Sequence, residues 1–235
     1  MKTRQLIKKE LKFYLNTLTG YVLVSLFAVL VNIFFLKDLF AIRSFQISNF
    51  FSTIPWIFVF FIPALTMRSL SEEKKNNTFE VLLSLPVKES QIVLSKFWTA
   101  LILVIVGLVL TFPALIFVKI VSNVYLLEIL SGLLGVVLIA SAFISFSLFV
   151  SSLTDSYVVS FLISSVALMF LMFFQSSVFE GVISDMILRP VAFLLPYSHY
   201  LDFTKGLVEL DSVIYFLSFS FVFLVASIIN LERKN

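Results

Sequence analysis

The chain has 235 residues, of which 60% are hydrophobic and only 13% charged, and its mean hydropathy is +1.08. An average soluble domain carries about 25% charged residues, so this composition leaves too little polar surface to cover a soluble core. We therefore predict an integral membrane protein. The absence of cysteine excludes disulfides, thiolate metal sites and thiol catalysis.

Residues 1–19 form the first predicted element, an amphipathic segment in which apolar side chains recur at helical spacing with lysines between them. This pattern predicts a helix on the membrane surface, with Lys8, Lys9, Lys12 and Tyr14 at the lipid interface. The segment is too long and too polar for the start of a typical signal peptide. No small-x-small cleavage site follows the next apolar run, so we expect the first span to be retained.

Six stretches are long and apolar enough to cross a bilayer as helices, which takes about 17 to 25 residues. In lipid every backbone polar group must be satisfied within the segment, so helix prevails over local strand propensity. The alternation typical of barrel strands is absent. The predicted fold class is all-α, one transmembrane domain over 1–235, with spans at about 20–36, 50–67, 97–118, 129–150, 157–174 and 213–229.

Lysine and arginine are unevenly distributed between the two sides of these spans. If the N-terminus is cytoplasmic, twelve lie on the inner side and five on the outer side. The positive-inside rule therefore predicts that both termini are cytoplasmic. On the outer side, the apolar middle of 175–212 is too short to span, and Pro190 and Pro196 would divide it into two short re-entrant or interfacial helices.

A polar stretch, 72–91, interrupts the apolar sequence on the predicted cytoplasmic side. Asn77 can cap a helix, Glu80 follows at the capping-box position, and Pro86 ends the run. The sequence predicts a two-turn helix at about 78–85 that is apolar on much of its circumference. It could lie flat on the membrane or enter a groove of a partner protein, and the acidic residues beside it favour the protein partner.

Motifs for catalysis are weak. No P-loop pattern is present, and we expect no catalytic residues, no metal and no cofactor. His199 lies three residues before Asp202, but the nucleophile or further ligands that a catalytic or zinc site needs are missing, so a structural role is favoured. The many serines of the fourth and fifth spans favour helix packing, with a polar path as the alternative.

The run IPALTMRSLSEEKKNNTFEVLLSLPVKESQIVLSKFWTA resembles the second span, coupling region and third span of ABC-2-type permeases. It looks most like the gliding-motility-associated permease family. The matching positions are Pro63, Ala64, Thr66, Met67, Arg68, Glu72, Glu73, Thr78, Glu80, Leu82, Leu83, Pro86 and Lys96. Weaker similarity, as in SSLTDS and YSHYLDFTKG, extends over most of the chain. Asn77 stands where the family usually has glycine, so the resemblance does not determine the backbone geometry of the turn before Thr78.

The resemblance implies the permease subunit of an ATP-driven exporter in the bacterial inner membrane. The chain itself would not be an enzyme, because ATP would be hydrolysed in a partner. Segment 1–19 would be a connecting helix, 78–85 a coupling helix, and 178–203 re-entrant outer helices. The residues expected to contact the ATPase are Glu73, Thr78, Phe79, Glu80, Leu82, Leu83 and Pro86.

The resemblance also implies the partners. They are ABC ATPase subunits, a second permease copy or paralogue that completes the pore, and membrane lipids, with no nucleic acid. The residues alone leave two alternatives, a secondary transporter working without ATP and a non-transporting membrane scaffold. A secondary transporter would need a midplane ionisable site and internal repeats, and the sequence shows neither clearly.

Overall fold

The computed structural model describes residues 3–42, 47–75, 88–121, 125–173 and 195–233, and every regular element in those ranges is a helix. Five of these helices are long and apolar enough to cross a membrane, and the described part of α8 is a shorter apolar helix. The chain is thus a helical membrane protein. The helices are α1 Thr3–Asn16, α2 Leu18–Ile42, α3 Ile47–Lys75, α5 Glu89–Leu110, α6 Phe112–Val121, α7 Leu126–Leu153, α8 Tyr157–Phe173, α10 Pro196–Thr204 and α11 Leu210–Glu232.

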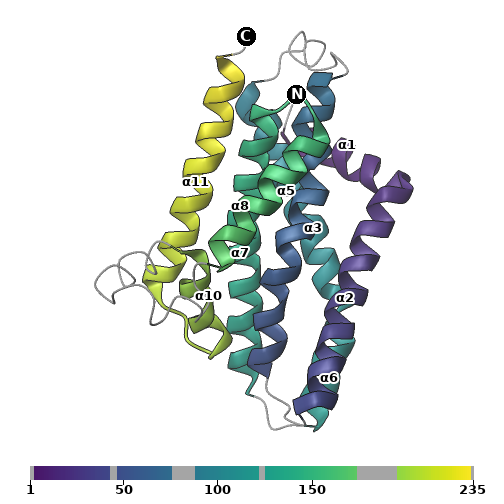
Figure 1. Ribbon diagram of the computed structural model, residues 1–235, viewed down its shortest axis with the longest axis vertical. Coiled ribbons are helices and arrows are strands. Elements are labelled where there is room, and N and C mark those ends of the chain that lie inside the picture. Colours follow the sequence, from purple (N-terminus) through teal and green to yellow (C-terminus); the bar gives the residue numbers. More distant parts are fainter. Residues whose placement is uncertain (1–2, 43–46, 76–87, 122–124, 174–194, 234–235) are drawn as a thin grey trace.

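The long helices form a bundle with α7 at its centre (Figure 1). The most extensive packing joins α7 to α3 on one side and to α11 on another, and α8 also packs against α3 and α7. Helix α2 lies on the side of the bundle away from α11, while α1 crosses the end at which α11 finishes. Helix α10 lies toward the opposite end, beside the beginning of α11. Both termini are therefore at one end of the bundle.

Small residues on α7 allow this close packing. A Cβ added at Gly132 would come within 2.3 Å of the Phe51 ring, and one added at Gly135 within 2.5 Å of the Phe203 Cβ. The buried serines bond mainly to their own helix, as Ser145 does to the Ala142 carbonyl at 2.8 Å. These observations support helix packing as the role of the serines that have such bonds.

The third predicted span, 97–118, is not one continuous helix. Helix α5 ends at Leu110, Thr111 closes it through its backbone N–H, and α6 begins at Phe112. Pro113 explains the break, because proline offers no N–H to the carbonyl four residues earlier and its ring clashes with that carbonyl. In the first turn of α6 the proline is tolerated, since an N–H there would have no partner within the helix.

A second proline leaves a backbone carbonyl free for a hydrogen bond between two elements that are distant in sequence. Pro55 lies within α3, so the Phe51 carbonyl receives no N–H from the residue four positions later. The hydroxyl of Tyr200 in α10 donates to that carbonyl at 2.6 Å, and both residues are fully buried. A side chain 149 residues away thus supplies the missing donor and fixes α10 against α3.

Helix α10 is also fixed at its end and along its side. Gly206 has φ +86° and follows the helix, and the N–H groups of Gly206 and Leu207 bond the carbonyls of Phe203 and Asp202. This is a Schellman cap, which favours glycine at the left-handed position. His199 is buried, its Nδ1 lies 3.2 Å from Ser212 Oγ, and its ring stacks on Tyr215 at 4.3 Å. These contacts support the structural role expected for His199.

Candidate functional site

Most of the predicted ATPase-contact residues, Thr78, Phe79, Glu80, Leu82, Leu83 and Pro86, lie outside the described residues. Glu73 lies near the end of α3, where the backbone alone is described. The segment 76–87 is nevertheless bounded by described structure, since α3 leads into it and α5 leads out of it. The candidate site is therefore built from the ends of these two helices and from the helices that pack on them.

Four helices meet in a small buried cluster beside this segment, which we call the four-helix junction. Its members are Leu6 of α1, Leu70 of α3, Ile92 and Val93 of α5, and Leu231 of α11. None is more than 4% exposed. The junction brings both helices that flank 76–87 into contact with the two helices nearest the chain termini.

Helix α1 also makes two polar contacts beside the junction, an ion pair with α5 and a hydrogen bond with α3. Glu10 Oε1 lies 3.3 Å from Lys96 Nζ of α5, with side-chain exposures of 22% for Glu10 and 3% for Lys96. The Tyr14 hydroxyl donates to the Leu65 carbonyl of α3 at 2.9 Å. One helix thus reaches both flanks of the segment, through an ion pair on one flank and a neutral hydrogen bond on the other.

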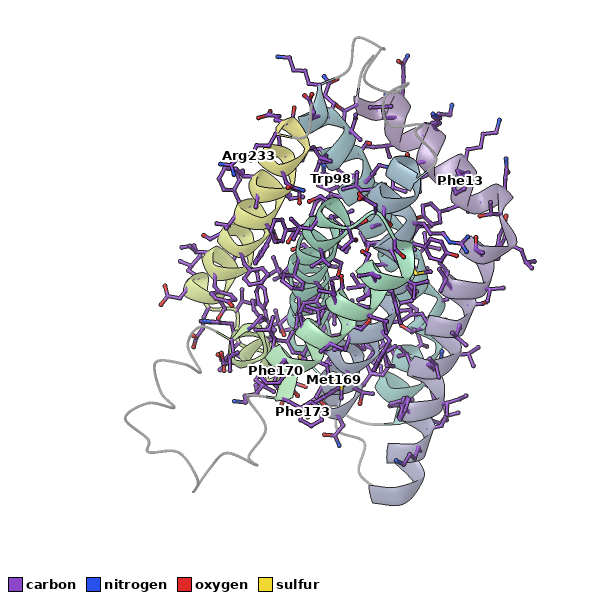
Figure 2. The ribbon with its side chains drawn as sticks, turned by 45° about the horizontal axis from the view of Figure 1, so that its top comes forward. Phe13, Trp98, Met169, Phe170, Phe173 and Arg233 are labelled. Atoms are coloured by element: carbon purple, nitrogen blue, oxygen red, sulfur yellow. The ribbon has the colours of Figure 1, made fainter. Side chains whose placement is uncertain are left out.

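The predicted lipid-interface residues lie on two faces of α1. Lys8, Lys9 and Lys12 are exposed, whereas Tyr14 is half-buried and bonded to α3. Contact of the three lysines with lipid stays a prediction. Figure 2 shows exposed apolar side chains on the outside of the bundle, with Phe13 and Trp98 in one half, and Met169, Phe170 and Phe173 of α8 farther along.

The end of α7 is attached to the same region. Ser151 Oγ lies 3.4 Å and 3.3 Å from the backbone nitrogens of Leu70 and Ser71, and it accepts both N–H groups. Asn230 of α11 donates to the Ser152 carbonyl at 2.7 Å. That carbonyl belongs to the last turn of α7, where helix carbonyls commonly bond to groups outside the helix, so Asn230 helps to complete the helix end.

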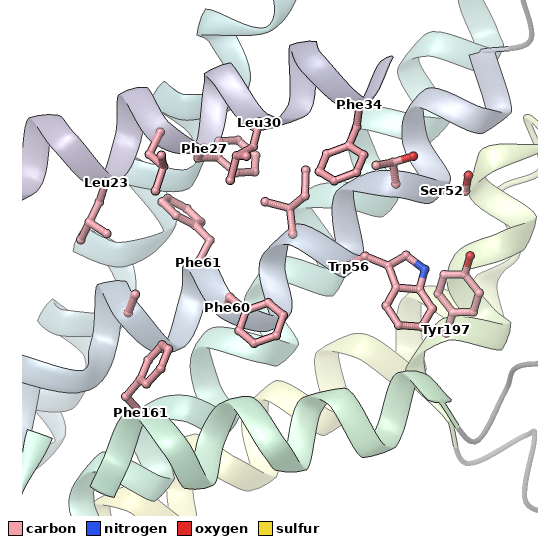
Figure 3. A pocket seen from close by; sticks show the side chains of 14 residues that line it. Leu23, Phe27, Leu30, Phe34, Ser52, Trp56, Phe60, Phe61, Phe161 and Tyr197 are labelled. Atoms are coloured by element: carbon pink, nitrogen blue, oxygen red, sulfur yellow. The ribbon is translucent and has the colours of Figure 1, made fainter. Parts of the chain in front are cut away.

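A cavity of about 640 Å³ lies away from the junction, between α2, α3, α8 and α10. Figure 3 shows Leu23 and Phe161 toward one end of it, and Ser52, Trp56 and Tyr197 toward the other. The walls are mostly leucine and phenylalanine, and no charged side chain contributes to them. A cavity of this size suits an apolar ligand with a few neutral hydrogen-bonding groups at one end.

The described residues contain no cluster of metal-ligating side chains. Within those ranges no three histidine, aspartate or glutamate residues gather as a metal site would require. The polar contacts near the junction join helices to one another. The arrangement joins four helices at the junction and offers, away from it, a cavity that suits an apolar ligand.

The sequence profile described as ABC-2 family transporter protein matches residues 43–230, from just before α3 almost to the end of α11. The chain belongs to the ABC-2 transporter family. It is therefore a multi-pass permease of an ABC transporter, a family whose members associate with an ABC ATPase subunit. The match is to the family as a whole and does not single out the gliding-motility type. Comparison with curated proteins finds no match.

Sequence reasoning did not assign several residues of this ABC-2 permease. Lys96 was matched to the family pattern without a partner, and Glu10, Ser151 and Asn230 received no role. The sequence does contain a signal for the Glu10–Lys96 ion pair, because Glu10 is the only acidic residue in α1 and Lys96 is the only lysine in the apolar α5. The contacts of Ser151 and Asn230 depend on helix packing and leave no sequence signal.

Proposed function

We propose that this permease is the membrane subunit of an ATP-driven exporter of the bacterial inner membrane. Residues 1–235 form one transmembrane domain, six spans cross the membrane with 157–174 as the fifth, and both termini are cytoplasmic. ATP is hydrolysed in a partner subunit. A second permease copy or paralogue completes the pore. Within the ABC-2 family, we assign the chain to the gliding-motility-associated permeases, which its sequence resembles.

The coupling helix, 78–85, docks into the ATPase in this proposal, with Glu73, Thr78, Phe79, Glu80, Leu82, Leu83 and Pro86 at the contact. The observation that carries it is the four-helix junction. Both helices that flank 76–87 are buried there beside α1 and α11. A displacement of the docked segment is therefore passed to α3 and α5, and packed helices respond by rigid shifts rather than by gradual bending.

The cavity between α2, α3, α8 and α10 is the place we propose for the apolar part of the substrate. Helix α3 both lines this cavity and leads into the coupling segment. Movement of α3 would therefore change the cavity directly. In this proposal one helix, α3, connects the ATPase contact to the substrate cavity. A secondary transporter or a scaffold would not require such a connection.

Replacement of Leu82 by arginine tests this proposal. A charge in the apolar face of the coupling helix must be desolvated at the contact with the ATPase. We therefore expect co-purification with the ATPase subunit encoded nearby to fall at least about tenfold, equivalent to about 1.4 kcal/mol of binding free energy. The control is Leu127→Arg, on an exposed leucine at the other end of the bundle. Equal recovery of the ATPase with both variants would refute docking at 78–85.

A further inference from the structure

The cavity between α2, α3, α8 and α10 runs along these helices rather than across them. Its α2 wall extends from Leu23 to Phe34, and its α3 wall extends from Ser52 to Ala64. At the helical rise of 1.5 Å per residue, these two stretches measure about 16 Å and about 18 Å. One leaflet of the hydrocarbon core is about 15 Å thick, which is half of its full thickness of about 30 Å. The cavity therefore has the length of a lipid chain in one leaflet.

One side of this cavity is buried in the bundle, and the other side faces outward. Phe27, Ile57 and Phe61 of its wall are at most 8% exposed. Leu26 and Phe60 of the same wall are 51% and 55% exposed. Both belong to helices that are long and apolar enough to cross a membrane, so the outward side meets the bilayer. A lipid chain can therefore enter the cavity sideways from the membrane.

Neutral polar groups gather at one end of the cavity, where Figure 3 shows Ser52, Trp56 and Tyr197. The Ser52 and Thr53 hydroxyls donate to the Asn49 carbonyl at 3.0 Å and 2.9 Å, which leaves their oxygens as acceptors. Burial raises the pKa of Tyr197 more than a side-chain hydrogen bond with Trp56 lowers it, so the phenol keeps its proton. None of the described residues that line the cavity is charged. This end suits a head group with hydroxyls, because a phosphate or an ammonium there would lack a counter-charge.

We propose that the cavity binds one chain of a membrane lipid whose head group is uncharged and carries hydroxyls, and that such a lipid is the cargo of the exporter. The end of the chain lies near Ala64 and Phe161, and the head group lies at Thr53 and Tyr197. This polar end is on the α10 side of the bundle, away from both chain termini. If the termini are cytoplasmic, the lipid is held as it lies in the outer leaflet. The inference rests on the proposed function and adds the chemical class of the substrate.

Tryptophan fluorescence tests this site directly, because Trp56 lies in the cavity wall and Trp98 is the other of the two tryptophans in the chain. Trp98→Phe, outside the cavity, leaves Trp56 as the reporter. The full chain with this substitution is placed in phosphatidylcholine vesicles that contain a small fraction of a lipid with brominated chains, which quench tryptophan on contact. Two such lipids are compared, glucosyl-diacylglycerol with an uncharged sugar head and phosphatidylglycerol with an anionic head. Both carry the same chains.

We expect the glucosyl lipid to reach half-maximal quenching of Trp56 at a mole fraction about fivefold lower than phosphatidylglycerol, a preference of the size that one neutral hydrogen bond gives. Thr53→Val keeps the shape of the side chain without its hydroxyl and should reduce this preference. Ala64→Phe fills the other end of the cavity and should abolish it. The control is Val106→Phe, at an exposed position of α5 outside the cavity, which should leave it unchanged.

Equal quenching by the two lipids would overturn the proposal, because Trp56 would then meet bulk lipid alone. Quenching by neither lipid would also overturn it, since another surface, such as the second permease copy, would then cover the cavity.

The role of the lipid as cargo is measured on the permease together with its ATPase subunit. The glucosyl lipid should raise the rate of ATP hydrolysis with the wild-type permease and should not do so with Ala64→Phe. Preferential quenching without this rise would refute the lipid as cargo. Leu82→Arg should keep the quenching and lose the effect on hydrolysis. Failure of docking at 78–85 is therefore seen in hydrolysis, whereas failure of the lipid site is seen in fluorescence.

Discussion

Replacement of Glu10 by alanine is expected to destabilise the permease more than replacement of Lys96 by methionine. Without Glu10, the buried ammonium of Lys96 loses one carboxylate partner at 3.3 Å, and breaking a buried pair in this way costs about 3–5 kcal/mol. Methionine instead fills the place of Lys96 with an apolar side chain of similar length. The Glu10 carboxylate is 22% exposed and can reach water, so we expect a loss of about 1 kcal/mol or less.

The measurement is the thermal unfolding midpoint of each variant in lipid nanodiscs. Lys12→Ala is the control, because it removes an exposed charge from the same helix. We expect the order control, Lys96→Met, Glu10→Ala from highest to lowest midpoint. Equal losses for Glu10→Ala and Lys96→Met would contradict this prediction, because they would mean that other groups stabilise the Lys96 ammonium once Glu10 is removed.

Tyr200→Phe is the second substitution with a large expected effect. It removes the hydroxyl that donates to the Phe51 carbonyl, which Pro55 deprives of its helical donor. A buried carbonyl left without a donor costs about 1–3 kcal/mol. The half-buried Tyr197 lies on the same helix, so Tyr197→Phe is the matched control and should have a smaller effect.

Pro55→Ala provides the stricter form of this experiment. Alanine restores an N–H that can bond the Phe51 carbonyl, so Tyr200→Phe should be less harmful in that background than in the wild type. A double-mutant cycle on unfolding midpoints measures the difference. The same loss in both backgrounds would show that the Tyr200 hydroxyl does not substitute for the donor that Pro55 removes.

The sequence predicted the helical class because hydropathy over about 20 residues reports membrane spans directly. It was less informative about continuity. Pro113 lies within the third predicted span, 97–118, and the structure shows that α5 ends at Leu110 and a separate helix follows. Whether a proline bends or ends a helix depends on the partners available to the freed carbonyls, which sequence does not show.

Long-range polar ties were beyond sequence reasoning for a similar reason. Pro55 indicates that the Phe51 carbonyl needs another donor, yet nothing in the chain identifies Tyr200 as that donor. Glu10 and Lys96 are 86 positions apart, and each stands out only as a charge in an unexpected place. The predicted ATPase contact came from local capping signals and family resemblance, and most of it lies outside the described residues.

We propose that an ATPase subunit drives this ABC-2 permease through residues 78–85. The most direct test measures ATP hydrolysis by the neighbouring ATPase subunit in lipid vesicles, alone and with the permease. We expect the wild-type permease and Leu127→Arg to change the hydrolysis rate to the same extent, and Leu82→Arg to leave it at the rate of the ATPase alone. A rate that is the same without permease, with the wild type and with Leu82→Arg would show that residues 78–85 do not couple the permease to the ATPase.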